Sequence, residues 1–558
     1  MPAALVLAGC SASHHRKRAD KEVYGVLQQK EGQLFGKTNA FSIDTRYSSR
    51  KPDDIKPPEI IEERAGEGVM TITLDDALKM AYDNNRQYQL RKETLYLTAL
   101  TLTEARYVFS PQFSAGTTVS GTRETDGDKR GQVNSAVGVD QFLKTGGRLG
   151  VTLANDLLRY FTGSPRREAV SLISMNLVQP LLRGAWADVA AESLTQAERD
   201  VIYEIRSFTQ FQRSFAVDIV STYFRLLRDK DTVRNQYSNY RSTVLSSERS
   251  QALAKDRLPA VQADQARQSE LRAKRNYLTA VKRYQDNLDN FKITLGLPIS
   301  TRVFLDDTVL ADLKEIGLLP VELTDETGYR ITLEHQLDLL NEIDRFEDQK
   351  RKIKVASNQL KTQLNFFANG SLESNGPTDY TTFDPGNISA DVGLELDLPV
   401  NRLVQRNRYR DALIRFERQI RTFSLALDDA RENVSEGLRT LKLSRQSYEI
   451  ERNALELANR RVESAELLVK AGRTPIRDLL EAQDAQIASQ NAVTQALVDY
   501  HVARLNLLRD LGTLRVDVDK FWLAEQPLPQ PRSGTPQPAA EPTLLEEVIP
   551  PDKLFEVR

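Results

Sequence analysis

The chain has 558 residues and nearly balanced charges, with 76 Lys and Arg against 78 Asp and Glu. A net charge of −2 excludes an electrostatic argument for nucleic-acid binding. The hydrophobic fraction of 40% is low for soluble domains and indicates long helices with little globular core. After the N-terminus no stretch of 18 apolar residues occurs, so no transmembrane helix is predicted.

The first ten residues are typical of the end of a secretory signal. An apolar run over residues 3–9 finishes in small residues directly before Cys10, the only cysteine, and polar and basic residues follow. Leu7-Ala8-Gly9-Cys10 resembles a bacterial lipobox, although the run is short and no basic segment precedes it. That resemblance implies lipid attachment at Cys10; the alternative is an incidental thiol.

Both ends of the chain are predicted to lack regular structure. Residues 11–70 are polar, contain Pro52, Pro57 and Pro58, and are predicted to be an extended linker. Residues 521–558 include a Pro-rich stretch and are predicted to be a mostly disordered tail.

Between these ends the chain repeats itself, as residues 71–300 and 301–520. A helical stretch from Thr73 recurs from about Thr324, with an offset of 251 residues. The later parts keep a constant offset of 216 without a gap, so that Arg257, Pro259, Ala266, Ala280, Tyr284, Leu295 and Gly296 recur as Arg473, Pro475, Ala482, Ala496, Tyr500, Leu511 and Gly512. Each copy is therefore predicted to consist, in this order, of a helix, strands, a long helix, a turn and a second long helix.

Each copy contains one very long helix. From about Ala185 to Ala254 there is no proline or glycine, and apolar residues at steps of three and four form one stripe. Seventy residues would make a rod of roughly 105 Å. A matching rod is predicted from about Asn407 to Lys470. Rods of this length bury their stripes only against other rods, and periodicity alone favours an ordinary coiled-coil scaffold.

The segments between the helices indicate β-strands instead of a plain scaffold. In Asn387–Leu398, apolar residues alternate with an acidic face that includes Asp391, Glu395 and Asp397. Such a strand fits a transmembrane barrel with apolar side chains toward lipid and acids toward a wet lumen. The first copy has corresponding strands at Gln112–Thr122 and Val170–Val178. An extra pair, 134–141 and 148–154, flanks the hairpin signal Lys144-Thr145-Gly146-Gly147.

The lipobox, the duplication, the long helices and the inserted strands together resemble the TolC-like outer-membrane efflux family, over roughly Thr73 to Leu514. Gln179-Pro180-Leu181-Leu182-Arg183-Gly184 resembles the family's strand-to-helix junction. Ala471-Gly472-Arg473-Thr474-Pro475 resembles its periplasmic helical tip. The resemblance implies a mainly α fold with a small β-barrel: duplicated helical hairpins form a periplasmic α-barrel, and a homotrimer shares one transmembrane β-barrel. We expect twelve strands from three chains, with the extra pair extending the outer rim; eighteen would follow if that pair joins the barrel.

The implied function is a non-enzymatic export duct in the bacterial outer membrane. The partners implied are a periplasmic adaptor and an inner-membrane transporter, which would dock at the helical tips around Arg257, Leu258, Pro259, Gly472, Arg473, Thr474 and Pro475. A type I protein secretion duct has the same fold, and a soluble coiled-coil scaffold is the remaining alternative.

Asp478 and Glu481 are the candidate gate residues. Their i, i+3 spacing puts both on one side of a helix, and threefold symmetry would gather six carboxylates into a cation-attracting ring. Spacing alone favours two solvated acids near a helix N-terminus. The sequence has Gln262 and Thr474 where the family often has an acid and a basic latch residue, so Arg473 or Arg477 would have to replace the latch.

The sequence contains no catalytic constellation, cofactor motif or metal-ligand spacing. Its four histidines are His14 and His15 in the predicted linker, and His335 and His501, isolated on helices, where solvated or capping roles are expected. No Gly-rich phosphate loop follows a strand.

Overall fold

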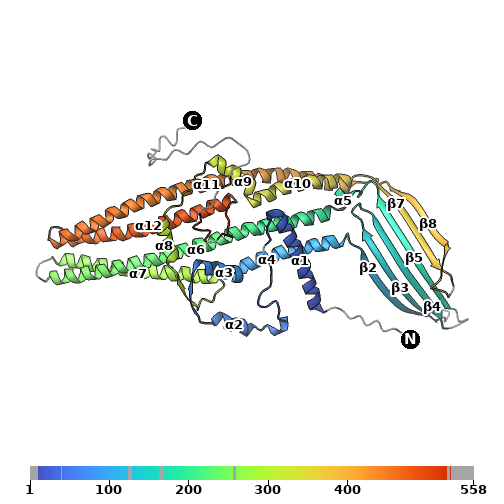
Figure 1. Cartoon of the computed structure of the whole chain (residues 1–558), viewed down its shortest axis with the longest axis horizontal. Helices are drawn as coiled ribbons and strands as arrows, with labels where there is room; N and C mark the ends of the chain where they lie inside the picture. The colour runs from blue at the N-terminus through green and yellow to red at the C-terminus, as the bar shows by residue number, and fades with distance from the viewer. Residues whose placement is uncertain are drawn as a thin grey trace.

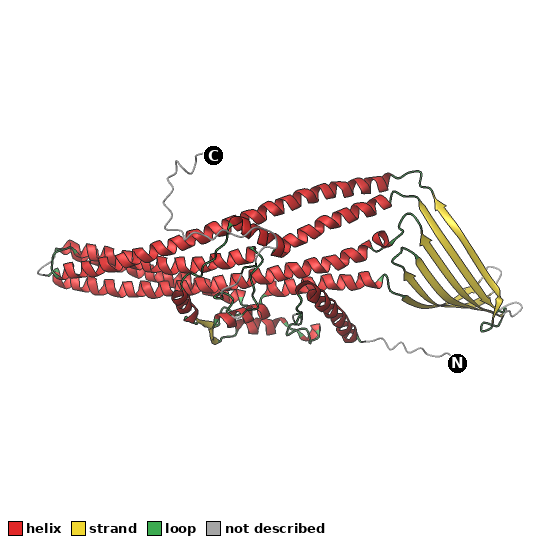
Figure 2. Cartoon of the chain, turned by 45° about the horizontal axis from the view of Figure 1, so that its top comes forward, coloured by secondary structure: helices red, strands yellow, loops and turns green. Residues whose placement is uncertain are grey.

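Long helical rods carry a single β-sheet at one end (Figures 1 and 2). This computed structural model describes residues 11–524 except 39, 124–128, 162–166, 256–258, 377 and 519, together with 528 and 529. The predictions for Cys10, Arg257 and Leu258, and for most of the predicted tail, concern residues outside the described part of the chain.

Two pairs of helices form the rods. The helices α6 (Glu192–Leu253) and α11 (Leu403–Lys470) turn back into α7 (Ala260–Thr294) and α12 (Ile476–Asp510). At 1.5 Å per residue, the 62 residues of α6 and the 68 of α11 extend about 93 and 102 Å. The predicted stripe of α6 is buried, for example at Val201, Phe215 and Ile219, where it packs into the main hydrophobic core.

The duplication is visible in the lengths of the elements. Both ends of α12 lie 216 residues after those of α7. An offset of 251 relates α3 (Leu74–Asn84) to α9 (Asp325–His335), α4 (Arg86–Tyr107) to α10 (Leu337–Asn358), and β2 (Gln112–Arg123) to β7 (Gln363–Ser374). The same capping pattern starts each copy, since the side chains of Thr73 and Thr324 accept hydrogen bonds from backbone amides three residues on.

The sheet has six antiparallel strands in the order β2-β3-β4-β5-β7-β8. The remaining strands are β3 (Lys129–Phe142), β4 (Arg148–Tyr160), β5 (Arg167–Pro180) and β8 (Phe383–Asp397). The predicted hairpin joins β3 to β4, with Gly146 at φ 92 in its turn. A Cβ at Gly146 would lie 2.3 Å from the Gly184 carbonyl oxygen, so the position requires glycine.

The prediction that the extra pair extends the outer rim is wrong. β3 pairs with β2 and β4 pairs with β5 along their whole lengths, so the pair lies inside the sheet. The sequence pattern identified both strands but contained no information about which neighbours they pair with.

Smaller elements lie along the rods, most of them around the middle and α5 (Ala187–Ala190) beside the sheet (Figure 1). The others are α1 (Ala12–Phe35), the 3-10 turn Pro52–Asp54, α2 (Pro57–Ala65), α8 (Thr308–Ile316) and a parallel pair formed by β1 (Val69–Ile72) and β6 (Arg302–Leu305).

The prediction of an extended linker over residues 11–70 is therefore wrong. Helix α1 buries Val23, Val26 and Leu27 against the core, because this short i, i+3, i+4 stripe lies in a stretch without proline. Pro52 and Pro57 stand at the starts of helical turns, where the missing N–H costs nothing.

The predicted start of the disordered tail, at residue 521, is also wrong. Phe521 and Trp522 are buried in the core, and the guanidinium of Arg504 donates to the carbonyl of Ala524 at 2.6 Å. The aromatic rings of Phe521 and Trp522 bury a large apolar area. The prolines that follow them in the sequence hid this signal for an ordered segment.

His501 is buried in the core, where a solvated or capping role was expected. Its Nε2 bonds the Gly317 carbonyl at 2.9 Å, while its Nδ1 has no partner. Burial, with a smaller effect of Arg504, lowers the pKa of His501 to about 4. A lowered histidine pKa leaves folding stability unchanged above about pH 6.5, where the ring is neutral in both states, and opposes folding increasingly as pH falls toward 4.

We expect His501→Leu to weaken the acid sensitivity of the fold. Between pH 7 and pH 4.5 this group should cost the native protein about 2 kcal/mol, which the variant should not lose. Urea unfolding midpoints at the two pH values measure the difference. Equal losses in both proteins would show that other groups cause the acid sensitivity.

A two-faced sheet and the helical tips as candidate functional site

The register divides the sheet into an apolar and a polar face across all six strands. Two complete rows on one face are Phe113, Val139, Val151, Met175, Gly370, Ala390 and Ala115, Val137, Leu153, Ile173, Leu372, Ile388. Two rows on the other are Ser114, Gly138, Thr152, Ser174, Ser371, Ser389 and Gln112, Asp140, Gly150, Asn176, Asn369, Asp391. The alternation predicted for one strand thus extends over the whole sheet, with a few apolar side chains such as Phe367 on the polar face.

The apolar face is open to its surroundings. No helix covers the sheet in Figures 1 and 2. Val119, Val137, Ile388, Val392, Leu394 and Leu396 are all exposed, with Val392 at 69% and Leu394 at 64%. An exposed apolar surface of this extent marks a contact with lipid or with another protein.

Exposed aromatic residues lie at both ends of the strands. Tyr107, Phe113 and Trp186 are exposed at the helical end, and Phe161 and Tyr380 at the opposite end. Trp186 has φ 75 and follows the Gln179–Gly184 junction, so its backbone is held in a strained turn. Aromatic girdles at two levels, separated by an apolar band, are typical of sheets that cross a bilayer.

The predicted acids of β8 lie on the polar face. Glu395 accepts a hydrogen bond from the Asn365 side chain of β7 at 3.0 Å. Asp391 lies opposite Asn369, and Asp397 opposite Gln363. All three acids therefore share their face with amide side chains.

The two turns between the rods lie at the end of the molecule farthest from the sheet (Figure 1). Gly472, with φ 70, lies just after the C-terminal end of α11. Pro259 and Pro475 directly precede the first residues of α7 and α12. A pocket of about 630 Å³ lies at this tip. Gly472, Arg473, Thr474 and Pro475 line it together with Arg249, Ser250 and Leu253 of α6, which the sequence pattern did not single out.

The two candidate gate acids have separate local partners. Asp478 accepts a hydrogen bond from the Thr474 hydroxyl at 2.7 Å and lies 3.6 Å from Nε of Arg477. Glu481 lies 3.4 Å from Arg461 of α11. The Glu481 side chain is 65% exposed and that of Asp478 is 42% exposed, so solvent weakens both ion pairs and they offset little of the charge. Arg477, and not Arg473, is the arginine in contact with Asp478.

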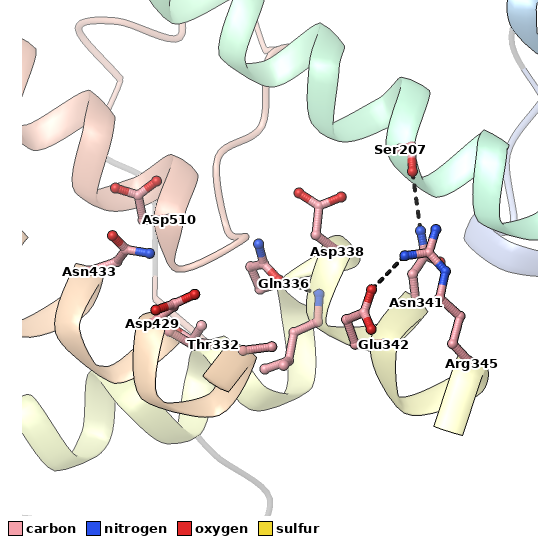
Figure 3. A pocket seen from close by; sticks show the side chains of 13 residues that line it. Ser207, Thr332, Gln336, Asp338, Asn341, Glu342, Arg345, Asp429, Asn433 and Asp510 are labelled. Atoms are coloured by element: carbon pink, nitrogen blue, oxygen red, sulfur yellow. Dashed lines mark hydrogen bonds and ion pairs between the residues drawn. The ribbon is translucent and has the colours of Figure 1, made fainter. Parts of the chain in front are cut away.

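A second pocket, of about 310 Å³, is lined by residues of α6, α9, α10, α11 and the end of α12, and Figure 3 shows it from close by. Asp338, Glu342, Asp429 and Asp510 line it, and Glu342 is paired with Arg345 at 2.5 Å. In the described part of the chain no three His, Cys, Asp or Glu residues are grouped as a metal site would require.

A buried carboxylate, Asp348, joins α10 to α6 near this pocket. It is 2% exposed and accepts hydrogen bonds from Tyr203 at 2.6 Å, Arg199 at 2.7 Å and Arg351 at 2.9 Å. These contacts fix α10 against α6 where the rods approach the sheet. Sequence reasoning missed this network because its members lie about 150 positions apart and each looks like an ordinary solvated charge.

No described helix is both long enough and apolar enough to traverse a lipid bilayer.

Comparisons with known proteins agree with this geometry. Residues 329–513 match a family model described as outer membrane efflux protein. No curated relative matches the chain.

Solved structures similar in fold include three outer-membrane proteins, each aligned over 79% of this chain. The Campylobacter jejuni CmeC outer membrane channel is 14% identical, with 85% of its chain covered and a TM-score of 0.57. The outer membrane protein VceC from Vibrio cholerae is 12% identical, with 96% covered and a TM-score of 0.57. The Neisseria gonorrhoeae MtrE outer membrane channel is 14% identical, with 88% covered and a TM-score of 0.55. The chain thus contains a segment that matches the outer membrane efflux protein family, and it has the fold of these outer-membrane channels.

Proposed function

We propose that this protein is the export duct of a tripartite efflux system, passing small molecules across the outer membrane without catalysing a reaction. The division of the sheet into complete apolar and polar rows carries the proposal. In a bilayer the apolar rows face lipid, and the polar rows with Asp391 line a wet lumen. A soluble scaffold would have to cover the apolar rows with another layer.

One copy cannot form the duct alone, because β2 and β8 are open edges of the sheet. Open edges are not tolerated in lipid, so copies must join edge to edge, and we propose a homotrimer. The rods of three copies then enclose a hollow periplasmic cylinder. A duct for secreted proteins would share this geometry, and the identity of the co-purifying adaptor and pump separates the two functions.

The tips are the proposed docking surface for a periplasmic adaptor and an inner-membrane transporter. They are the ends farthest from the sheet, and the pocket there gives an adaptor a recess lined by the cationic residues Arg249, Lys470 and Arg473. Because the repeat matches Arg257, Leu258 and Pro259 to Arg473, Thr474 and Pro475, these three residues are proposed as docking residues as well.

Asp478 and Glu481 are the proposed cation ring at the entrance. The variant carrying Asp478→Asn and Glu481→Gln should lose cation selectivity in planar bilayers and be blocked less by multivalent cations. Glu456 is exposed on α11, 14 residues before the helix ends at the tip. Replacing it with Gln should change neither property. Unchanged selectivity and block in the double variant would place the gate elsewhere.

Cys10 is the proposed lipid attachment site, on the basis of the apolar run before it. Cys10→Ala should abolish labelling by a palmitate analogue while trimers still form, because the anchor is separate from the sheet. Labelling that persists in the variant would contradict this assignment.

A further inference from the structure

The hairpin β3–β4 has the properties of an integral part of the sheet. It pairs with β2 on one side and β5 on the other from end to end. Val137, Val139, Val151 and Leu153 continue the apolar face. On the polar face, the Gln132 amide donates to the Asp156 carboxylate at 3.1 and 3.0 Å. A hairpin extending only the outer rim would need no apolar rows at this depth.

The helices above the sheet show what the hairpin adds. Helix α4 leads into β2, α6 follows β5, α10 leads into β7 and α11 follows β8. These four helices pack in the order α4, α6, α10, α11. Although α4 and α6 are direct neighbours, their strands β2 and β5 are separated by β3 and β4. The hairpin therefore widens the sheet without adding a helix.

Widening makes the sheet match the helical layer. Four helices at 8–10 Å spacing cover roughly 36 Å. Six strands, about 4.8 Å apart and tilted by about 40°, cover roughly 38 Å, whereas four strands would cover only about 25 Å. The six-stranded sheet can thus continue the helical layer at nearly constant circumference.

Resting on the proposed trimer, we propose that three copies close an eighteen-stranded barrel in which the hairpin β3–β4 of each copy sets the width. The number of strands per chain is even, so β8 of one copy meets β2 of the next in antiparallel orientation and the alternation continues around the ring. Strand spacing and tilt give a backbone diameter of about 36 Å for eighteen strands and about 24 Å for twelve. The duct therefore suits solutes too large for a twelve-stranded exit.

Electron cryomicroscopy of the detergent-extracted protein counts the strands directly. Three copies with eighteen strands are expected. Three copies with twelve strands, the hairpin lying outside the barrel, would overturn the proposal and leave the export function standing. Any other number of copies would overturn both the barrel size and the proposed trimer.

Deleting residues 124–161 tests the same proposal functionally. The deletion removes β3 and β4 and leaves β2 and β5, which run antiparallel and can pair. The largest polyethylene glycol that enters the channel from the sheet side should become smaller, while entry from the tip side should be unchanged. If trimers of the deletion variant keep the original size limit on the sheet side, the hairpin does not set the width. If the variant forms no trimers, the strand count in the unaltered protein decides.

Discussion

Leu394→Arg should prevent stable insertion of the sheet into the outer membrane. Leu394 is exposed on the apolar face, and an arginine at mid-bilayer on a lipid-facing position costs about 2–4 kcal/mol. Its neighbour Glu395 lies on the polar face, so Glu395→Arg should lose little beyond one hydrogen bond to Asn365. The yield of membrane-inserted trimer after detergent extraction compares the two variants.

The pair Leu153→Arg and Thr152→Arg repeats this comparison on β4, where the same register separates the faces. The first should impair assembly and the second should not. Equal tolerance within both pairs would refute the assignment of the faces.

Asp348→Ala should destabilise the joint between α10 and α6 by about 3 kcal/mol. Removing a buried carboxylate leaves the guanidinium groups of Arg199 and Arg351 without their shared acceptor. Arg199 is 33% exposed, so water can solvate its charge in the variant. We therefore expect a loss of stability at the lower end of the range for a broken buried ion pair. The midpoint of urea unfolding, followed by helical circular dichroism, measures the effect.

Glu347→Ala is the matched control on the adjacent residue of α10. Glu347 pairs with Lys350 at 2.7 Å, but both side chains are about half exposed, so its loss should cost less than 1 kcal/mol. Similar midpoints for the two variants would show that the Asp348 network contributes little to the joint.

The helical rods were predictable from the sequence because a continuous apolar stripe without proline or glycine has few alternatives. The observed α11 begins four residues before its predicted start at Asn407 and ends at the predicted Lys470. Most of the strand β8 was predictable because apolar and polar or small side chains alternate from Ile388 to Asp397.

Pairing between strands could not be predicted, because it depends on contacts between distant segments. Nothing in residues 134–154 specifies that they lie between β2 and β5 and not beyond the rim. The helix α1 was missed because only three of its residues are buried, and its polar surface has the composition of a linker.

At the candidate site, the sequence indicated the tip segment Gly472–Pro475 and the acids of β8 but not their surroundings. The contribution of Arg249 and Leu253 to the tip pocket arises from the packing of α6 beside the α11–α12 turn. The partners of Asp478 and Glu481 likewise became visible only when α11 and α12 were in place.

If the two-faced sheet spans the outer membrane as a barrel shared by three chains, the protein should behave as an integral trimer of that membrane. Separation of inner and outer membranes, an alkaline carbonate wash, and native mass spectrometry of the detergent-extracted protein test it together. The protein should stay in the washed outer-membrane fraction and have the mass of three chains. A protein that the wash releases without detergent, or that is extracted as a single chain, would contradict it.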